Sequence, residues 1–260
     1  MFMKNYDFKP LKSFLYHLFL KYNYLYRSIS GSFDPEMKYI KKFTKDNDIA
    51  LDIGANIGIY TRYLAKNFNR VESFEPIQQA YKYIEALELQ NVKLHKVALS
   101  NEQKKNFINV PVKGGVFRFG NSSIENFAGS KYNSVQKFPI KSELLDCYDY
   151  QKIDFIKIDV EGHELKVLEG GKSTIKRLKP LLLIEIEQRH LSPHLSIYDV
   201  FQYIFEMGYK GFFLENDKIK SIENFSLDKH QLQYLDYSLI KLSNRKKAAM
   251  YPESVNLNAK

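Results

Sequence analysis

Three carboxylates and one histidine lie close together at the end of an apolar run. The run is Ile153–Ile158, and the polar residues that follow it are Asp159, Glu161, His163 and Glu164. Charged groups at the end of a buried strand are costly as core material, so this cluster favours a site over a core. Such groups can move protons, hold hydroxyl groups or attract a cation.

A turn of small residues follows another apolar run, Ile49–Ile53. Every second position after it is a small or turn-forming residue, Gly54, Asn56 and Gly58, and a helical pattern begins at once. A strand, a tight turn and a helix receive nucleotide-like ligands in open α/β sheets. Glycines let the backbone approach the ligand, and the helix start offers free N–H groups. The spacing differs from the G-x-G-x-x-G of dinucleotide folds, and Asp52 stands two residues before the first glycine.

An acid also ends the next strand-like run. Glu75 lies seventeen residues after Gly58, where a residue that accepts ribose hydroxyls is expected. Asp52, at the end of its own strand, could meet an amino group or hydroxyl and would be an odd neighbour of a pyrophosphate. A positively charged ligand with a ribose suits both acids, so we expect S-adenosyl-L-methionine (SAM) as the cofactor. The simpler alternative is a small-residue turn of any α/β protein, which Glu75 disfavours.

Methyl transfer from a sulfonium to a hydroxyl needs an aligned acceptor and a group that takes its proton. His163 titrates near neutrality and is a candidate base. Asp159 could orient His163, bind the acceptor or act as the base itself, and Glu161 could hold a substrate hydroxyl. The simpler alternative for His163 is a helix-start residue bonded to a neighbour. We interpret Glu164 as a first-turn acid that the helix dipole favours.

Three segments together resemble the FkbM-type SAM-dependent methyltransferases. They are Leu51–Gly58, Phe74–Pro76 and Lys157–Glu164, and the resemblance extends roughly from residue 48 to 188. It implies a Rossmann-like methyltransferase fold and usually O-methylation of a sugar or natural-product hydroxyl. By position it puts the loop 159–163 at the reaction centre. The residues that it puts on the cofactor are Asp52, Gly54, Asn56, Gly58 and Glu75.

The elements that must position these residues alternate between strand and helix. We expect an α/β fold of the Rossmann-like class I methyltransferase type, with a mostly parallel, doubly wound sheet and a reversed C-terminal edge hairpin. The expected strands are 49–53, 71–75, 92–99, 153–159, 181–186, 209–214 and 237–242, with helices after residue 58 and at 78–89, 164–168 and 196–207. The fourth strand then lies beside the first, so the two loops should face each other. Ala98, at the exit of the third strand, is expected over the adenine pocket.

Residues 101–150 interrupt this alternation. Strands are expected at 106–110 and 135–140, with loop chemistry between them. Long insertions at a ligand-facing edge often carry function, so Asn121 and Ser122 are candidate substrate contacts. A simple extra hairpin is the alternative.

The fifth strand offers a possible metal ligand. Glu185 lies near its end, and with Asp159 it could bind a divalent cation through carboxylate oxygens. A third ligand is not obvious, so we expect no metal. Glu185 could instead bind a substrate hydroxyl, and Glu187 and His190 are weaker candidates.

The chain of 260 residues is long enough for one large α/β domain. We expect a helical segment over 1–47, the methyltransferase domain over 48–242 and a polar tail over 243–260. In the first segment, Leu11, Leu15, Leu18, Tyr22 and Leu25 share one helical face. That face would pack over the domain or form a dimer contact, or would touch a membrane surface.

Composition bounds the partners and the compartment. The net charge is +9, but the lysines are scattered, which favours a solvated surface over a nucleic-acid groove. The single cysteine, Cys147, allows no internal disulfide, so a reducing, cytoplasmic location is the simpler expectation. No apolar run reaches the length of a membrane span, and no clear cleavage site marks a signal peptide.

Three functions remain in competition. The leading hypothesis is O-methylation of a small-molecule or glycan hydroxyl. An RNA methyltransferase is the second, which the charge supports, although the chain lacks an amine-methylating motif of the N/D-P-P-Y type. A non-catalytic protein that binds SAM or a nucleotide is the third.

Overall fold

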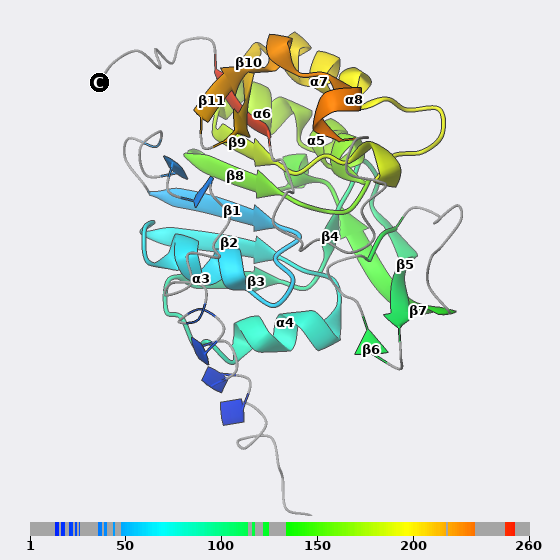
Figure 1. Cartoon of the computed structure of the whole chain (residues 1–260). Coiled ribbons are helices and arrows are strands. Elements are labelled where there is room, and N and C mark those ends of the chain that lie inside the picture. Colours follow the sequence, from blue (N-terminus) through cyan, green and yellow to red (C-terminus); the bar gives the residue numbers. More distant parts are fainter. Residues whose placement is uncertain are drawn as a thin grey trace, which may run out of the picture.

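The computed structural model describes most of the chain from residue 48 onward. The described residues are 48–113, 116–117, 122–124, 134–216, 218–231 and 248–252, with residues 14, 15, 17, 18, 21, 22, 24, 26, 36, 37, 39, 40 and 44 before them. They form one eight-stranded sheet and a second sheet of four strands, with helices on both faces of the larger sheet (Figure 1).

The central sheet has the strand order β11-β10-β12-β9-β8-β1-β2-β3. Its strands are β1 Ile49–Ile53, β2 Arg70–Phe74, β3 Val92–His95, β8 Phe155–Ile158, β9 Leu181–Ile184, β10 Tyr209–Glu215, β11 Lys218–Ser221 and β12 Ala248–Pro252. The five strands from β9 to β3 are parallel. Strand β12 runs antiparallel between β9 and β10. The expected fold class, with its reversed strand near the C-terminus, is thereby confirmed.

Two expectations about strands are wrong. Residues 248–252 belong to the sheet as β12, although the sequence indicates a polar tail from residue 243. The expected strand 92–99 is two strands, because the chain leaves the central sheet after β3 and enters the second sheet at β4, Ala98–Leu99. The expected strand 237–242 lies outside the described residues.

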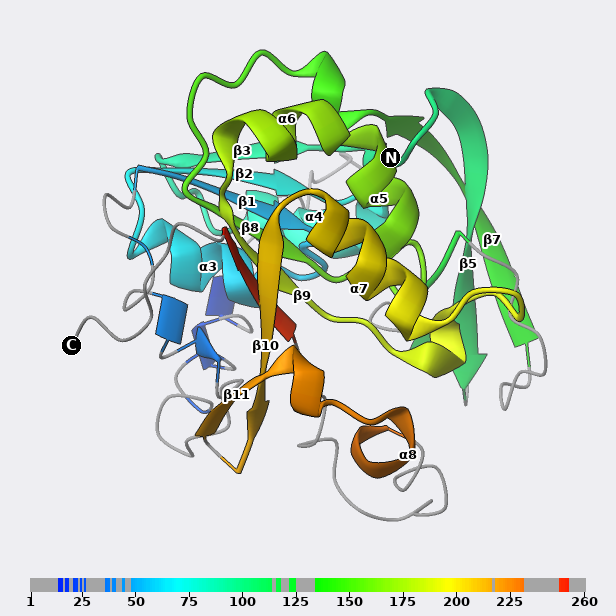
Figure 2. The same cartoon turned by 90° about the horizontal axis from the view of Figure 1, so that it is seen from above.

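Alternate residues of the parallel strands face two different helical layers. Leu51 and Ile53 of β1 belong to a core with α5 (Glu164–Gly170), α6 (Lys172–Leu178) and α7 (Ile197–Glu206). Ala50 belongs to the opposite core with α3 (Ile59–Ala65). Figure 2 shows α5, α6 and α7 on one face of the sheet and α3 on the other. This alternation decides which polar side chains reach the site, because neighbouring strand residues point to opposite faces.

Two further helices lie beside the strands. Helix α4 (Gln78–Glu85) lies beside β3, and α8 (Leu227–His230) lies near the last described strands. Three 3-10 turns complete the described elements: η2 Leu145–Cys147, η3 Gln188–His190 and η4 Ile222–Asn224. The expected helix at 196–207 is confirmed, because Ser196 caps α7 and forms a capping box with Asp199.

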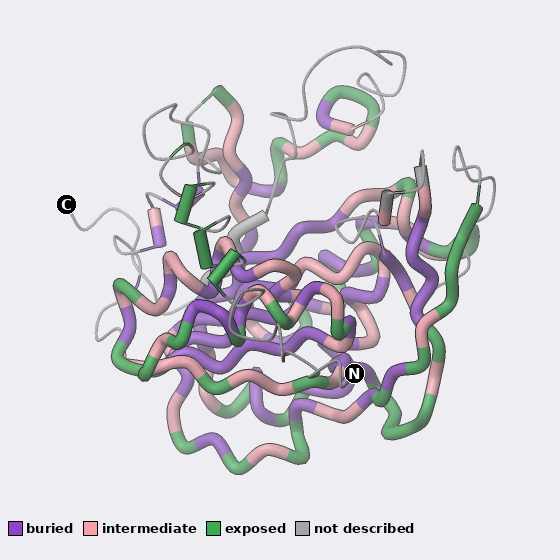
Figure 3. The backbone as a smooth tube through the Cα atoms, turned by 90° about the horizontal axis from the view of Figure 1, so that it is seen from below, coloured by how far each residue is buried: buried purple, intermediate pink, exposed green. Residues whose placement is uncertain are grey.

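The second sheet stands at the carboxyl edge of the parallel strands (Figure 1). Its order is β4-β7-β5-β6, with β5 at Lys104–Lys113, β6 at Val116–Phe117 and β7 at Ser134–Glu143. The expected strands at 106–110 and 135–140 lie within β5 and β7. The central sheet is largely buried, whereas the first half of β7 is exposed (Figure 3).

The N-terminal segment presents apolar side chains to solvent at the positions that are described. Leu15, Leu18 and Tyr22 are 50–67% exposed, so these three side chains do not pack against the described part of the domain. The opposite side of the segment makes the contacts, through His17 to the carbonyl of Ala86 and Tyr24 under Arg62. Within the described part of the chain, no helix is long and apolar enough to cross a membrane.

Candidate active site

The turn after β1 takes a backbone path that glycine permits. Gly54 has a φ of 75° and Asn56 one of 50°. A Cβ on Gly54 would lie 1.9 Å from the carbonyl oxygen of Asp159. The N–H of Asp159 also donates to the carbonyl of Ile53 at 3.1 Å. The turn after β1 and the loop after β8 therefore touch through their backbones, as the parallel order of these strands predicts.

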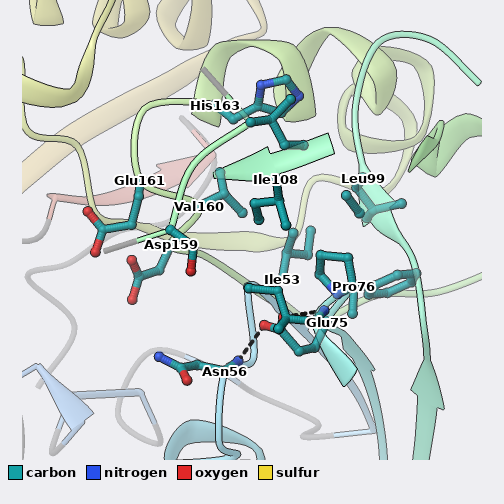
Figure 4. Close-up of a pocket in the computed structure, with 16 residues that line it drawn as sticks. Ile53, Asn56, Glu75, Pro76, Leu99, Ile108, Asp159, Val160, Glu161 and His163 are labelled. Atoms are coloured by element: carbon teal, nitrogen blue, oxygen red, sulfur yellow. Dashed lines mark hydrogen bonds between the residues drawn. The ribbon is translucent and has the colours of Figure 1, made fainter. Parts of the chain in front are cut away.

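Glu75 fixes the shape of this turn. Its two carboxylate oxygens accept the N–H groups of Asn56 and Ile77, each at 2.8 Å (Figure 4). Burial raises the pKa of Glu75 to about 7, and the two backbone hydrogen bonds oppose that rise. A buried carboxylate at the end of β2 is thus present where a ribose hydroxyl acceptor was expected.

Asp52 is not among the residues that line the cavity around this turn, and its contact with the cofactor stays a prediction. It lies one residue before Ile53 and therefore points to the α3 face of the sheet. There it is fully buried and accepts a hydrogen bond from the hydroxyl of Thr61 at 2.7 Å. Its role in the structure is to hold α3 and Lys157.

Lys157 links the two loops through charge. It is paired with Asp52 in the β1–β8 register, and its side chain is only 4% exposed. Its Nζ lies 3.4 Å from a carboxylate oxygen of Asp52 and 3.4 Å from one of Asp159, and it donates to the carbonyl of Gly54 at 3.0 Å. One buried cation thus contacts β1 through Asp52, the turn through Gly54 and the loop through Asp159.

The acidic loop turns sharply at its middle. Glu161 has a φ of 51° and Gly162 one of 97°. A Cβ on Gly162 would lie 2.1 Å from the carbonyl oxygen of His190, so the loop packs directly against η3. The carboxylate of Glu161 lies 2.7 Å from Nδ1 of His190. Glu161 is therefore paired with His190, which lies in η3 after the end of β9.

His163 points away from Asp159 and Glu161 (Figure 4). It is buried, and its Nε2 lies 3.0 Å from the hydroxyl of Ser100. It also occupies the N-cap position, directly before the first residue of α5. This position matches the simpler alternative stated for it, a helix-start residue bonded to a neighbour, and its role as a base stays a prediction.

Glu164 does more than occupy the first turn of α5. It is buried, and one carboxylate oxygen accepts the N–H of Gly162 at 3.0 Å. Burial raises its pKa to about 7, and the hydrogen bond from Gly162 opposes that rise. Glu164 therefore stabilises the turn that aims Glu161.

One cavity collects most of the predicted site residues (Figure 4). Of these, the residues that line it are Gly54, Asn56, Glu75, Ala98, Asp159, Glu161 and His163. Its apolar wall includes Ile77, Leu99 and Ile108. Gly58 is not among the lining residues. It precedes α3 with a φ of 86°, and a Cβ there would meet Ile84 at 2.9 Å.

The second sheet contributes to the same cavity. Ile108, Ser122 and Ile124 line it, so the insertion reaches the ligand side as expected. Ser122 is therefore placed where a substrate contact was predicted. Asn121 lies outside the described residues.

The described residues do not assemble a metal centre. Among them, no group of three or more His, Cys, Asp or Glu side chains is arranged to hold a metal ion. Glu185 is buried beyond β9, where its N–H bonds to Ile158. The pair of Asp159 and Glu185 thus gains no third ligand in this part of the chain.

The sequence interpretation missed Lys157 and underrated His190. Lys157 looked like one polar residue inside an apolar strand, yet its parity with Asp52 across parallel strands was a usable signal. His190 lies outside the matching motifs, and only the three-dimensional packing of η3 against Gly162 brings it to Glu161.

Comparisons with known proteins identify a family for the chain. The family described as the methyltransferase FkbM domain matches residues 52–210. A solved methyltransferase FkbM from Methylobacillus flagellatus KT is 17% identical with a TM-score of 0.49, and the match covers 79% of this chain and 44% of that one. This chain therefore spans less than half the length of that protein.

Two further solved structures have similar scores. An rRNA methylase from Streptococcus thermophilus is 12% identical with a TM-score of 0.43, over 84% of this chain and 93% of that one. A SAM-dependent methyltransferase from Aquifex aeolicus is 18% identical with a TM-score of 0.42, over 84% and 89%. No curated protein matches the chain. Because the family match spans more than half of the sequence, the chain belongs to the FkbM methyltransferase family.

Proposed function

We propose that this chain is a SAM-dependent O-methyltransferase that acts on a hydroxyl of a sugar, a glycoconjugate or a related natural product. One observation carries the proposal: the buried carboxylate of Glu75 and the acidic loop at Asp159 and Glu161 wall the same cavity. Family membership supports the methyltransferase class. The hydroxyl acceptor rests on the resemblance and on the chemistry of the loop.

The hydrogen-bond acceptors and the apolar wall of the cavity fit the cofactor. Glu75 uses one lone pair of each oxygen for the N–H groups of Asn56 and Ile77. A carboxylate has further lone pairs, which could accept two ribose hydroxyls. The small side chain of Ala98 and the apolar side chain of Ile77 suit one face of an adenine ring.

The charge of the site also fits a cation. Asp159 and Glu161 line the cavity, whereas the cationic Lys157 is not among its lining residues. In a partly buried site an opposite charge is attracted more strongly than in water. The sulfonium and the ammonium group of SAM would therefore find two carboxylates, of which Asp159 is partly neutralised by Lys157.

The residues of the chain would divide the work as follows. SAM, when bound, supplies an electrophilic methyl group. Glu75 would hold the ribose, and Asp159 would bind the ammonium group or the acceptor. Glu161 lies at the cavity wall and would orient the acceptor hydroxyl. His163, which the sequence names as a candidate base, also lines the cavity, and its Nε2 lies 3.0 Å from the hydroxyl of Ser100.

The second sheet would help to select the acceptor. Ser122 and Ile108 line the cavity from β5 and the segment after β6. A hydroxyl beside an apolar side chain suits a sugar, which presents both hydroxyl edges and apolar faces. The acceptor would thus lie between the acidic loop and this wall.

Binding of the cofactor product tests the first part of the proposal. Isothermal titration with S-adenosylhomocysteine should give micromolar binding to the wild-type protein. Glu75→Gln should weaken it by about tenfold or more, because a hydrogen bond to a charged group contributes about 1.5–3 kcal/mol. Glu206→Gln is the matched control, since Glu206 is exposed on α7 and far from the cavity in sequence and fold.

Transfer of a tritiated methyl group tests the second part. Free sugars and sugar nucleotides should accept the label, and total RNA should not. Labelling of RNA alone would favour the second hypothesis. Binding without transfer to any acceptor would favour a non-catalytic protein, and absent binding would contradict the proposal.

A further inference from the structure

We infer that His190, oriented by Glu161, takes the proton from the acceptor hydroxyl. This inference rests on the proposed function, because it names the base of that same reaction. His190 lies outside the motifs that mark the family resemblance. The case for it comes from how η3 packs against the acidic loop.

The Glu161–His190 pair has the geometry of an oriented imidazole. Glu161 contacts Nδ1 of His190 at 2.7 Å, which leaves Nε2 as the nitrogen that can receive a proton. A carboxylate on Nδ1 selects this tautomer and stabilises the imidazolium that forms. The side chain of His190 is 13% exposed and that of Glu161 is 9% exposed. The pair is therefore held firmly but remains accessible.

The backbone of both partners is shaped to make this contact. Glu161 has a φ of 51° and so adopts the left-handed region, which is strained for a non-glycine residue. Gly162 then brings the loop so close to the carbonyl of His190 that a Cβ would not fit. Backbone strain of this kind persists where the surrounding structure enforces it, and it clusters at functional sites.

The turn that carries His190 is anchored on three sides. The N–H of His190 bonds to the carbonyl of Glu187 at 2.9 Å. Gln188 accepts the N–H of Ile197 at the start of α7 and donates to the carbonyl of Leu195. The N–H of Gln188 donates to the side chain of Gln231. The imidazole is thus fixed before any ligand binds, which favours catalysis by a positioned group.

The charges around His190 suit a proton acceptor near neutral pH. Burial lowers the pKa of His190, but the hydrogen bond and the charge of Glu161 raise it. The net pKa lies above the usual value for histidine. Glu187 adds to the rise and Arg189 opposes it. The neutral form of His190 is the base, and it becomes available as the pH rises through that pKa.

The proton balance of the reaction requires such a group. When the acceptor oxygen bonds to the methyl carbon, the carbon–sulfur bond breaks and its electron pair stays on sulfur. The hydroxyl proton is released in the same reaction, and Nε2 of His190 receives it. His190 later returns that proton to water.

The other candidate bases are engaged differently. His163 lines the cavity, but it is buried, its Nε2 lies 3.0 Å from the hydroxyl of Ser100, and it points away from Asp159. Asp159 is paired with Lys157 at 3.4 Å, so taking up a proton would cost it this charge pair. Only the Glu161–His190 pair, among these three, combines an oriented nitrogen with a partner that lines the cavity.

Nuclear magnetic resonance of the imidazole nitrogens tests the pair without any acceptor. Long-range ¹H–¹⁵N spectra, assigned with His190→Gln, should show His190 protonated on Nδ1 when neutral. Glu161→Gln should lower the pKa of His190 and leave that of the exposed His194 unchanged. An unchanged pKa of His190 in Glu161→Gln, or a neutral His190 protonated on Nε2, would overturn the inference.

Methyl transfer tests the role of the pair in turnover. With a sugar or sugar-nucleotide acceptor from the panel above, His190→Gln should lower kcat by about 100-fold or more. It should also remove the acid limb of the kcat/KM profile against pH. Binding of S-adenosylhomocysteine should change by less than about twofold, since His190 is not placed on the cofactor. His194→Gln, four residues further along the same segment, is the matched control.

His163→Gln separates this inference from the sequence-based alternative. If His163 is the base, its variant loses the acid limb and His190→Gln keeps it. The proposed function fails on its own terms if the wild-type protein neither binds S-adenosylhomocysteine nor transfers methyl groups. If binding occurs and the panel holds no acceptor, the nitrogen spectra still test the Glu161–His190 pair, and a missing pair overturns the inference.

Discussion

The turn after β1 and the loop after β8 wall one cavity but are stabilised by different contacts. In the turn, the single carboxylate of Glu75 accepts two backbone N–H groups. In the loop, side chains hold one another, as Glu161 holds His190 and Lys157 holds Asp159. The first region depends on backbone conformation, and the second depends on charge pairs that its side chains make with β8 and η3.

This difference explains which region a sequence reveals. The turn is encoded within a few consecutive residues, so its glycines and the later acid could be recognised. The loop takes one partner, Lys157, from the strand before it and another, His190, from η3, which is distant in sequence. For the loop after β8, the motif indicates which side chains could do chemistry, but it does not indicate that His190 contacts them.

The junction of the two regions should respond most strongly to substitution. Gly54→Ala would force a Cβ to within 1.9 Å of the Asp159 carbonyl, at a positive φ. We expect a loss of about 4 kcal/mol or more in the free energy of unfolding and loss of S-adenosylhomocysteine binding. Thermal and urea unfolding with titration calorimetry would measure both effects.

Gly208→Ala is the control for that experiment. Gly208 has a similar φ of 82°, but a Cβ there would meet only the flexible end of Lys179. We expect a loss of about 1–2 kcal/mol from the left-handed conformation alone, with binding retained. Equal losses in the two variants would show that the contact between turn and loop is not close.

The charge link should have the next largest effect. Lys157→Met leaves the fully buried Asp52 without its cation, so we expect a loss of about 3–5 kcal/mol in the free energy of unfolding. Lys152→Met removes a half-exposed lysine that pairs with Asp48 and Asp154, and it should cost much less because solvent screens such pairs. Similar losses from urea unfolding of the two variants would refute the role of Lys157.

The buried acid of the turn should give a characteristic pH dependence. Folding raises the pKa of Glu75 to about 7, so the stability that it contributes is present below its unfolded pKa of about 4.5. That contribution is lost as the pH rises towards 7. The stability of the wild type relative to Glu75→Gln should therefore fall between pH 5 and pH 8, by up to about 3 kcal/mol.

Urea unfolding of both proteins across this range would measure the effect. Glu164 has a pKa raised in the same direction, but it is present in both proteins and cancels in the difference. A pH-independent difference would show that Glu75 titrates normally in the folded state.

The wall from the second sheet should give the smallest effect. Ser122→Ala removes one hydroxyl from the cavity, so we expect the acceptor KM to rise about fivefold, as one hydrogen bond of about 1 kcal/mol predicts. Binding of S-adenosylhomocysteine should stay within twofold. A change in cofactor binding with an unchanged acceptor KM would place Ser122 on the cofactor side.

Much of the fold could be predicted because the parallel strands are continuous apolar runs. Short runs such as Leu181–Ile184, buried along their whole length, are typical of such sheets. The last strand could not be predicted, because β12 follows a long segment and pairs with β9 and β10 far from it in sequence. Its place in the sheet depends on pairing, and its own residue pattern is weak.

The site was predictable in position but not in orientation. Gly54, Asn56, Glu75 and the loop do meet at one cavity. Strand parity turns Asp52 towards Thr61 of α3, which the sequence interpretation did not consider. The orientation of His163 towards Ser100 depends on where β4 passes, which the sequence interpretation had placed in the central sheet.

The most direct test is a crystal structure of the wild-type protein with S-adenosylhomocysteine. We expect the ribose hydroxyls within hydrogen-bond distance of Glu75 and the sulfur between the turn at 54–56 and the loop at 159–161. A ligand bound elsewhere, or one whose ribose leaves the carboxylate of Glu75 untouched, would contradict the claim that these two regions form one methyl-transfer site.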